Sequence, residues 1–183
     1  MVTAPKQPMV YSYRDYCGWP DDERWELIDG MAYNMVPAPS TQHQRVSGRI
    51  FQALRGQLAG AGSACELFYS PFDVILDETN VVQPDLLLIC DPTKIVDEGC
   101  RGTPDLVIEI LSPSTALRDQ REKRELYQRF GVADYLLVDP IHKVVQHLSL
   151  QGDQYGPARV LGLDDVLEVT RHGLSLSIGE LFA

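Results

Sequence analysis

Two stretches of this chain are apolar at almost every position, yet each contains a carboxylate. Asp85 lies in Val-Val-Gln-Pro-Asp-Leu-Leu-Leu-Ile, and Glu109 lies in Pro-Asp-Leu-Val-Ile-Glu-Ile-Leu. Stretches of strand length that are apolar on both faces are typical of central strands with helices on each side of the sheet. Because an ionised carboxylate leaves water only at great cost, it normally neutralises, pairs with a cation or binds a metal. The sequence therefore predicts a layered α/β fold in which a cation faces these two side chains.

A lysine on the next predicted helix can supply this cation. The helix runs from about residue 116 to 130, after the strand that carries Glu109. One inward face is predicted by the i, i+3, i+4, i+7 spacing of Lys123, Leu126, Tyr127 and Phe130. Lys123 thus points in the same direction as the apolar residues, and we expect its ammonium to meet Glu109. Asp85, Glu109 and Lys123 together have the composition of a metal-dependent nuclease site.

The length and composition fit one domain. With 183 residues, of which 44% are hydrophobic and 23% charged, the chain can build a substantial core. We expect an N-terminal arm over 1–20, a hairpin and core over 24–140 and a β-rich extension over 141–183. No apolar run approaches the roughly 20 residues that span a bilayer, and the N-terminus has neither an apolar h-region nor a cleavage site. We therefore predict a cytoplasmic protein without a membrane partner.

The net charge of −10 argues against a surface that binds nucleic acid through bulk electrostatics, but it leaves room for a local basic groove. Positive charge is concentrated on two predicted helices, at Arg45, Arg49 and Arg55 and at Arg118, Arg121, Lys123, Arg124 and Arg129. The arginines at 118, 121 and 124 either contact phosphates or form a solvated helix face with neighbouring carboxylates. Both interpretations are open at this point.

The four cysteines do not form a recognisable metal motif. Cys17, Cys65, Cys90 and Cys100 include no CxxC pair, and the four histidines lie scattered among them. This spacing argues against a structural zinc site. A chain of this size with an adequate core and no export signal has little need of disulfides, so we predict four free thiols.

Local signals define a hairpin and a helix near the N-terminus. An Asp-Gly pair within residues 24–36 predicts the hairpin, and Pro37 ends it. Ser40 or Thr41 can cap the helix, which ends in a glycine-rich segment. The apolar face of this helix consists of Val46, Ile50, Phe51, Leu54 and Leu58.

The rest of the chain is mainly composed of strands. Strands are predicted over residues 65–69, 72–76, 81–90, 106–111 and 134–139. Residues 143–150 and 159–178 alternate more between apolar and polar side chains, as peripheral strands do. The order is therefore hairpin, helix, several strands, helix, strand and a β-rich extension, which predicts a mixed α/β fold.

The core order of helix, three strands, helix and strand, with Pro84-Asp85 and Glu109 on neighbouring strands, resembles the PD-(D/E)XK nuclease fold. Five strings look like one branch of it, the Uma2 (DUF820) family of restriction endonucleases: residues 25–30, 37–44, 82–86, 104–115 and 131–140. The resemblance runs from about residue 25 to the C-terminus. It implies a restriction-endonuclease-like α/β core, a mixed central β-sheet flanked by helices in αβββαβ order, with an N-terminal hairpin and a β-rich C-terminal extension.

The same resemblance implies an endonuclease that hydrolyses DNA phosphodiester bonds with Mg²⁺ or Mn²⁺. Asp85 and Glu109 are the implied metal ligands and catalytic residues, and the carbonyl of Ile110 is a further implied ligand. Glu26 lies in one of the matching strings and can complete the acidic cluster. A homodimer is expected, because two sites related by a two-fold axis suit the cutting of both strands of a duplex.

One position departs from the superfamily motif. Two residues after Glu109, where the motif has lysine, this chain has Leu111. In nucleases of this fold the lysine can come from the following helix, and Lys123 lies on the helix face that fits this role. The departure keeps open a nuclease-fold protein that binds nucleic acid or a partner without cleaving it. RNA and branched DNA also remain open as substrates.

Each candidate residue also has a structural alternative. Asp85 follows a proline and can turn or cap its strand. Glu109 and Lys123 can form a buried ion pair without a metal. His43, near the start of the first helix, either faces the site or lies on the helix surface, and we leave it outside the core site. Asp105 lies at a strand entry, where we favour a structural role.

Overall fold

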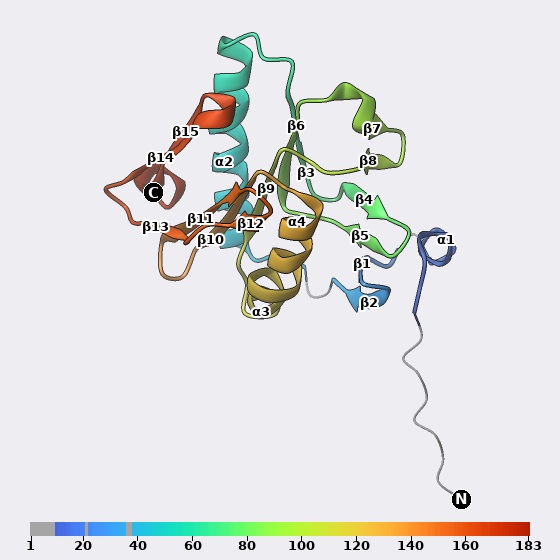
Figure 1. Cartoon of the computed structure of the whole chain (residues 1–183). Coiled ribbons are helices and arrows are strands. Elements are labelled where there is room, and N and C mark those ends of the chain that lie inside the picture. The colour runs from blue at the N-terminus through green and yellow to red at the C-terminus, as the bar shows by residue number, and fades with distance from the viewer. Residues whose placement is uncertain (1–9, 21, 36–37) are drawn as a thin grey trace, which may run out of the picture.

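The structure is a computed structural model that describes residues 10–20, 22–35 and 38–183. Its centre is a mixed β-sheet with the strand order β12-β11-β10-β9-β6-β3, and β13 pairs with β11 (Figure 1). The strands of this central sheet are β3 (Glu66–Tyr69), β6 (Leu86–Ile89), β9 (Leu106–Ile110), β10 (Asp134–Asp139), β11 (Val144–Gln151), β12 (Gln154–Tyr155) and β13 (Arg159–Leu161). β9 and β10 are parallel, and the other pairs are antiparallel. The predicted mixed α/β fold is confirmed.

Both faces of the central sheet are covered. Leu86 and Leu88 of β6 pack into the core that also contains the apolar side of α2 (Thr41–Gly60). Leu87, between them, packs on the other side, with residues of α4 (Arg124–Phe130). Since successive residues of a strand face opposite sides of a sheet, a strand covered on both faces must be apolar throughout. This is the reason for the continuous apolar runs in the sequence.

Helix α2 begins and packs as the sequence predicts. Ser40 is its N-cap, and the Ser40 side chain accepts a hydrogen bond from the backbone N–H of His43. The buried residues of its apolar face are spaced by four positions and are Val46, Ile50, Leu54 and Leu58. Phe51 is only half-buried. The face packs on the central sheet and on the C-terminal hairpin of β14 (Val166–Val169) and β15 (Leu174–Ser177).

The predicted helix over residues 116–130 is present, but its hydrogen-bond pattern changes along its length. It starts as α3 (Ala116–Arg118), continues as the π-helical segment η2 (Asp119–Lys123) and ends as α4. Lys123, Leu126 and Tyr127 are buried, as predicted. Gly131 ends α4 in the left-handed conformation, with a φ of 78°, which glycine adopts without steric cost. π-helical turns are frequent at functional sites.

A second sheet lies beside the central one, with the order β2-β1-β5-β4-β8-β7. Its strands are β1 (Trp25–Ile28), β2 (Met31–Asn34), β4 (Asp73–Asp77), β5 (Asn80–Val82), β7 (Ile95–Val96) and β8 (Gly99–Arg101). β1 and β2 form the predicted hairpin. Asp29 and Gly30 form its turn with φ values of 50° and 72°, the type I′ geometry that an Asp-Gly pair favours. Val36 and Pro37, where the hairpin was predicted to end, lie outside the described residues.

The prediction of one strand over residues 81–90 is wrong. β5 ends at Val82 and pairs within the second sheet, whereas β6 starts at Leu86 and belongs to the central sheet. The break falls at Gln83, Pro84 and Asp85, where proline cannot donate a ladder hydrogen bond. The short strands β7 and β8 were also not predicted, because two or three residues carry too little periodicity.

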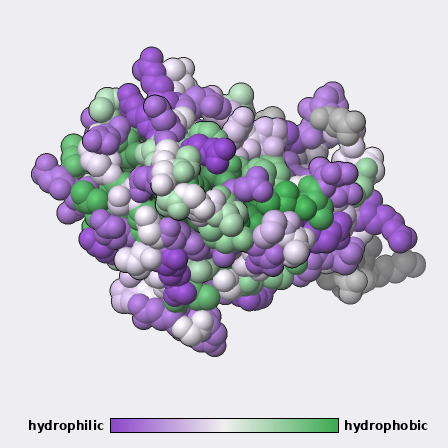
Figure 2. Space-filling model, turned by 90° about the horizontal axis from the view of Figure 1, so that it is seen from above, coloured by the Kyte–Doolittle hydropathy of each residue, from purple (hydrophilic) through white to green (hydrophobic). Residues whose placement is uncertain are grey.

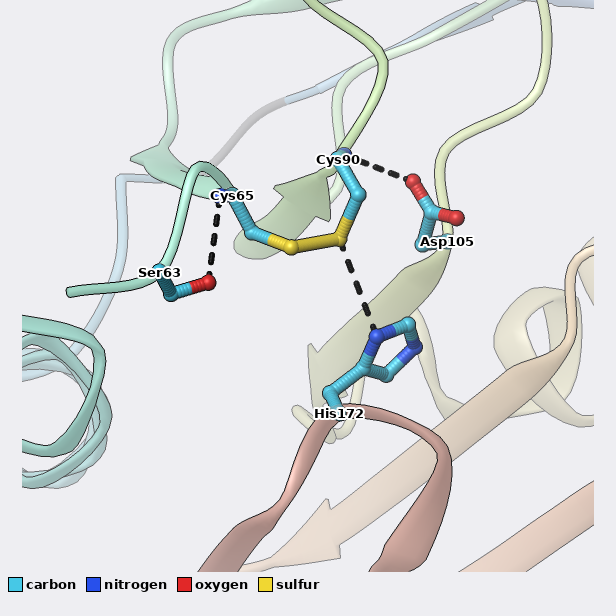
Figure 3. Close-up of a disulfide and its surroundings, with 5 residues drawn as sticks. All are labelled: Ser63, Cys65, Cys90, Asp105 and His172. Atoms are coloured by element: carbon cyan, nitrogen blue, oxygen red, sulfur yellow. Dashed lines mark hydrogen bonds between the residues drawn. A yellow bond between two sulfur atoms is a disulfide. The ribbon is translucent and has the colours of Figure 1, made fainter. Parts of the chain in front are cut away.

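The prediction of four free thiols is wrong as well. Cys65 and Cys90 form a disulfide (Figure 3). Cys17 and Cys100 are free. The two bridged cysteines are far apart in sequence, but they follow the register of β3 and β6. Glu66 pairs with Ile89 in that antiparallel register. Cys65, which precedes Glu66, therefore lies opposite Cys90, which follows Ile89. Asp105 has the structural role that we favoured, since its Oδ2 accepts the backbone N–H of Cys90 at 2.8 Å.

Short elements complete the periphery. They are α1 (Tyr13–Tyr16), η1 (Pro92–Lys94), η3 (Thr170–His172) and α5 (Ile178–Leu181). The exposed large apolar residues of the C-terminal extension are Ile141, Val160, Leu163 and Val166. Figure 2, which views the molecule from above, shows hydrophobic residues in a band across the middle of that face with hydrophilic residues around it. Within the described ranges, we find no helix with the length and apolar character of a membrane span.

Two glycine substitutions test which positions are helical: Gly131 lies just after the end of α4, and Gly56 lies inside α2. Gly131→Ala should lower the free energy of unfolding by about 1 kcal/mol, because an L-residue is strained at a φ of 78°. Gly56→Ala, in the exposed interior of α2, should raise it by about 0.5–1 kcal/mol, because alanine is the better helix former. A Cβ meets no neighbour within 4 Å at either glycine, so urea denaturation measures backbone effects alone. The same sign for both changes would contradict the assignment.

Candidate active site

Asp85 and Glu109 lie side by side at one end of the central sheet. Leu86 pairs with Ile108 across β6 and β9, so the next positions, Asp85 and Glu109, are opposite each other. The Asp85 side chain reaches across to β9, where its Oδ2 accepts the backbone N–H of Ile110 at 2.7 Å. Asp85 therefore joins two strands instead of capping its own.

Lys123 meets Glu109 as predicted. Its Nζ donates to Glu109 Oε1 at 2.8 Å, and Tyr127 donates its hydroxyl to the same oxygen at 3.0 Å. The Lys123 side chain is only 3% exposed. It also lies 3.8 Å from Asp119 Oδ1, one turn earlier on the helix. The π-helical segment thus directs Asp119 and Lys123 together toward β9.

Glu26 brings a third element to the cluster. It lies on β1 of the second sheet and is 1% exposed. Its Oε1 is 2.7 Å from Lys123 Nζ and accepts the backbone N–H of Gln83 at 2.9 Å. Arg118 Nη1 lies 3.8 Å from the other oxygen, and the Arg118 guanidinium stacks over the ring of Tyr33. Glu26 thus contacts the predicted lysine directly.

His43 contacts Asp85. From the sequence, His43 could either face the site or lie on the helix surface. The His43 Nε2 lies 3.1 Å from Asp85 Oδ2. Since that oxygen accepts, Nε2 carries the proton in this contact. The other ring nitrogen, Nδ1, is buried and has no hydrogen-bond partner among the residues that the structure describes. His43 therefore belongs to the site, although it was left outside the predicted core.

These side chains line a cavity of about 700 Å³. The charged and imidazole side chains in its wall are Arg24, Glu26, His43, Asp85, Glu109, Arg118, Asp119 and Lys123. Of the three arginines that the sequence left open, Arg118 faces the cavity, whereas Arg121 and Arg124 are exposed on the helix surface. The structure thus distinguishes Arg118 from Arg121 and Arg124 by position, and a phosphate contact by any of the three stays a prediction.

A family model described as "Putative restriction endonuclease" matches residues 11–179. The chain belongs to the Uma2 family. The match starts before residue 25, where the sequence resemblance begins, and so includes α1. This match confirms the family assignment that was made from the sequence. The Uma2 family is described as a family of nucleases.

Two further comparisons describe proteins that are similar to this Uma2 protein. An uncharacterized protein of Synechocystis sp. is 29% identical over 186 residues, which cover 98% of this chain and 95% of that protein. A crystal structure from Anabaena variabilis, described as a putative nuclease belonging to DUF820, matches with a TM-score of 0.77 and 19% identity. That match covers 93% of this chain and 97% of the other chain. At this identity the likeness concerns the fold, and it confirms the predicted nuclease-like α/β fold.

The cluster in this Uma2 protein has more negative than positive charge. Four carboxylates, on Glu26, Asp85, Glu109 and Asp119, surround two cationic side chains, on Lys123 and Arg118. Burial raises the pKa of Glu109 well above its usual range; Lys123 opposes this shift, and the other carboxylates add to it. Burial alone would lower the pKa of Lys123, but the surrounding carboxylates outweigh burial and raise it. Burial is thus the main cause of the raised pKa of Glu109, whereas the surrounding carboxylates cause the raised pKa of Lys123.

Asp119 is a member of the site that sequence reasoning missed. Burial raises its pKa from 3.8 to about 6, against the attraction of Lys123 and a hydrogen bond with Thr115. The sequence feature that could have identified Asp119 is its position four residues before Lys123. This spacing places both side chains on the same face of the predicted helix. It was instead interpreted as a partner of the neighbouring arginines on a solvated face.

The donor set fits a divalent metal ion. Asp85 and Glu109 offer carboxylate oxygens, which Mg²⁺ and Mn²⁺ prefer. Both hydrogen bonds that Glu109 accepts from described residues end on Oε1, so its Oε2 is left for another ligand. A dication would also offset the excess negative charge of the cluster. The roles of Asp85, Glu109 and Ile110 as ligands stay predictions, as do the catalytic roles of Asp85, Glu109 and Lys123.

Removal of Lys123 should expose the charge imbalance. Lys123→Met should lower the free energy of unfolding by about 3–5 kcal/mol in chelator at pH 7.5, because it leaves buried carboxylates without their shared cation. Adding Glu109→Gln should recover about 1–3 kcal/mol of that loss. Urea denaturation measures both, with the exposed Lys143→Met as the matched control. A loss in Lys123→Met no larger than in the control would refute the buried ion cluster.

The raised pKa of Asp119 predicts a pH dependence. A folded-state pKa of about 6 against 3.8 means that the native state holds the proton more tightly than the unfolded chain. The stabilisation from Asp119 is therefore complete below about pH 4 and is lost as the pH rises through 6. Asp119→Asn removes this loss, so the variant should gain stability relative to the native protein between pH 5 and pH 7.5. A stability difference that does not change with pH in urea denaturation would contradict the shift.

Proposed function

We propose that this Uma2 protein is a metal-dependent endonuclease that hydrolyses phosphodiester bonds in DNA, with Asp85, Glu109 and Lys123 as its catalytic residues. The observation that carries the proposal is the buried Lys123 ammonium, which contacts Glu109 and Glu26 in the wall of a cavity that Asp85 also lines. A buried structural ion pair alone would need no additional carboxylates and no cavity.

Asp85 and Glu109, with the carbonyl of Ile110, are the proposed ligands of Mg²⁺ or Mn²⁺. When bound, the cation would lower the pKa of a coordinated water and offset negative charge on the phosphate. The hydrogen bond from the Ile110 N–H to Asp85 Oδ2 holds that carboxylate in position. His43 holds the same oxygen from the side of α2. Two different elements thus orient Asp85.

Lys123 is proposed to replace the lysine that the superfamily motif has at the position of Leu111. Leu111 is buried among apolar residues in this protein, so position 111 contributes to packing. Lys123 reaches Glu109 from the helix and has three N–H donors. Two contact Glu109 and Glu26, and the third can donate to the attacking water or to a phosphate oxygen that gains charge.

Arg24 and Arg118 are the proposed contacts to the DNA backbone. Both line the cavity with the catalytic residues. Arg24 donates to Gln83 and Ser70, and Arg118 stacks on Tyr33, so each guanidinium is held in place before substrate binds. These local cations provide phosphate contacts in a chain whose net charge is −10. We further propose a homodimer, in which two such sites act on opposite strands.

A plasmid assay tests this function. Supercoiled plasmid is incubated with the protein and Mg²⁺ or Mn²⁺, and nicked and linear products are measured. The native protein should cleave in the presence of metal, whereas Asp85→Asn and Lys123→Ala should each reduce the rate at least about 100-fold. Asp105→Asn is the matched control, because Asp105 also lies in a Pro-Asp-Leu string but contacts Cys90.

The outcomes separate the alternatives. Equal cleavage by the native protein and by Asp85→Asn would indicate a contaminant or a different site. If folded native protein cleaves neither duplex DNA, RNA nor branched DNA, the nuclease proposal fails in favour of a binding protein with a nuclease fold. If Lys123→Ala does not fold, Asp85→Asn is the decisive variant. The Asp85 side chain is 20% exposed, so its substitution disturbs the core less. Sedimentation equilibrium tests the dimer separately.

A further inference from the structure

A second cluster of metal-binding side chains lies at the other end of β6. Asp85 immediately precedes this strand, and Cys90 immediately follows it. The sulfurs of Cys65 and Cys90 and a ring nitrogen of His172 all lie within 4.8 Å of one another. The shortest contact to the imidazole is 3.7 Å, between Cys90 Sγ and His172 Nδ1 (Figure 3).

The backbone holds these groups together independently of the disulfide. Cys65 and Cys90 flank the β3–β6 ladder, in which Glu66 pairs with Ile89. The Asp105 carboxylate also fixes the backbone N–H of Cys90. Because the ladder and this hydrogen bond do not involve sulfur, the two thiols would stay neighbours after reduction.

His172 is supplied by the C-terminal extension. It lies in η3, between β14 and β15, whose apolar residues pack in the same core as α2. Figure 3 shows its ring directed toward the Cys90 sulfur. Its Nε2 is buried without a hydrogen-bond partner in the described part of the chain. The packed hairpin therefore holds the imidazole against the two sulfurs.

Two thiolates and one imidazole are the donors that Zn²⁺ prefers, and they suit Mg²⁺ poorly. Two tetrahedral ligands with Zn–S and Zn–N bonds of about 2.3 and 2.0 Å lie roughly 3.6 Å apart, close to the 3.7 Å between Cys90 Sγ and His172 Nδ1. The fourth position is available to water. This donor set differs from the carboxylates around Asp85, which suit Mg²⁺ or Mn²⁺.

We propose that reduction of the Cys65–Cys90 disulfide creates a Zn²⁺ site formed by Cys65, Cys90 and His172. A dithiol reductant donates two electrons and two protons, the S–S bond breaks, two thiols form, and the reductant becomes its own disulfide. Zn²⁺ then displaces the two thiol protons and bonds to both sulfurs and to Nδ1. In the reverse direction a low-molecular-weight disulfide accepts the two electrons and becomes two thiolates, the Cys65–Cys90 bond re-forms, and Zn²⁺ is released because both thiolate ligands are lost. The same residues thus hold either a disulfide or a zinc ion, and this inference does not depend on the nuclease activity.

Zinc titration of the two redox forms tests the proposal. One sample is reduced with dithiothreitol and desalted without oxygen, and the other is kept oxidised. Each is titrated with Zn²⁺ in competition with a chromogenic chelator. The reduced protein should bind one additional equivalent per chain. Cys65→Ser and His172→Ala should weaken that binding by more than about tenfold, since even an outer-shell change can cost that much, whereas Cys17→Ser should not.

Spectroscopy and the variants make the test specific. Co²⁺ in the reduced native protein should show a sulfur-to-metal charge-transfer band that is absent in Cys65→Ser. Zinc bound equally by oxidised protein or by Cys65→Ser belongs to another site, such as the Asp85 cluster. If reduced, folded protein binds no more Zn²⁺ than Cys65→Ser does, the proposal is overturned. Circular dichroism of the reduced sample verifies that it is folded, and the Cys17→Ser variant controls for the exposed thiol.

Discussion

The contact of the Lys123 ammonium with Glu109 and Glu26 is the interaction on which the arrangement of this protein depends. Glu109 comes from the central sheet, Glu26 from the second sheet and Lys123 from the helix that covers both. Each charge would be very unfavourable in this buried position by itself. The two sheets and the helix therefore have to meet where the charges compensate one another, and this requirement sets the register between three elements that apolar packing alone would leave less defined.

The compensation is incomplete, and this is what makes the cluster a candidate active site. Carboxylates outnumber cationic side chains around Lys123, and they add to the rise that burial causes in the pKa of Glu109, although an ammonium touches that carboxylate. A cluster that served only stability would have balanced charges. The excess lies beside a cavity, where a divalent cation can reach it. At the opposite end of β6 the side chains are sulfur and imidazole, so the potential donor atoms at the two ends of this strand differ in chemical type.

The parts of the fold that depend on local periodicity could be predicted from the sequence. The inward face of the segment over residues 116–130 placed Lys123 toward Glu109, and the Asp-Gly pair identified the β1–β2 hairpin. The disulfide and the break between β5 and β6 could not be predicted in the same way. Both depend on which strands become neighbours, and the apolar residues on the two sides of Gln83, Pro84 and Asp85 belong to different sheets. The position of His43 stayed open because its partner Asp85 lies on a distant element, and Asp119 was missed because its helix face was interpreted as solvated.

The sequence by itself determined the family through its matching strings, and the α/β class through the order of its apolar segments. It also indicated the candidate residues Asp85, Glu109 and Lys123, because buried charges are too costly to arise without a partner. Only the tertiary structure decided which groups complete each cluster. It brought Glu26 from the hairpin to Lys123, His43 to Asp85, and His172 to the Cys65–Cys90 pair. These contacts join residues far apart in the chain, and their distances follow from strand order and helix packing, which no local pattern of side chains specifies.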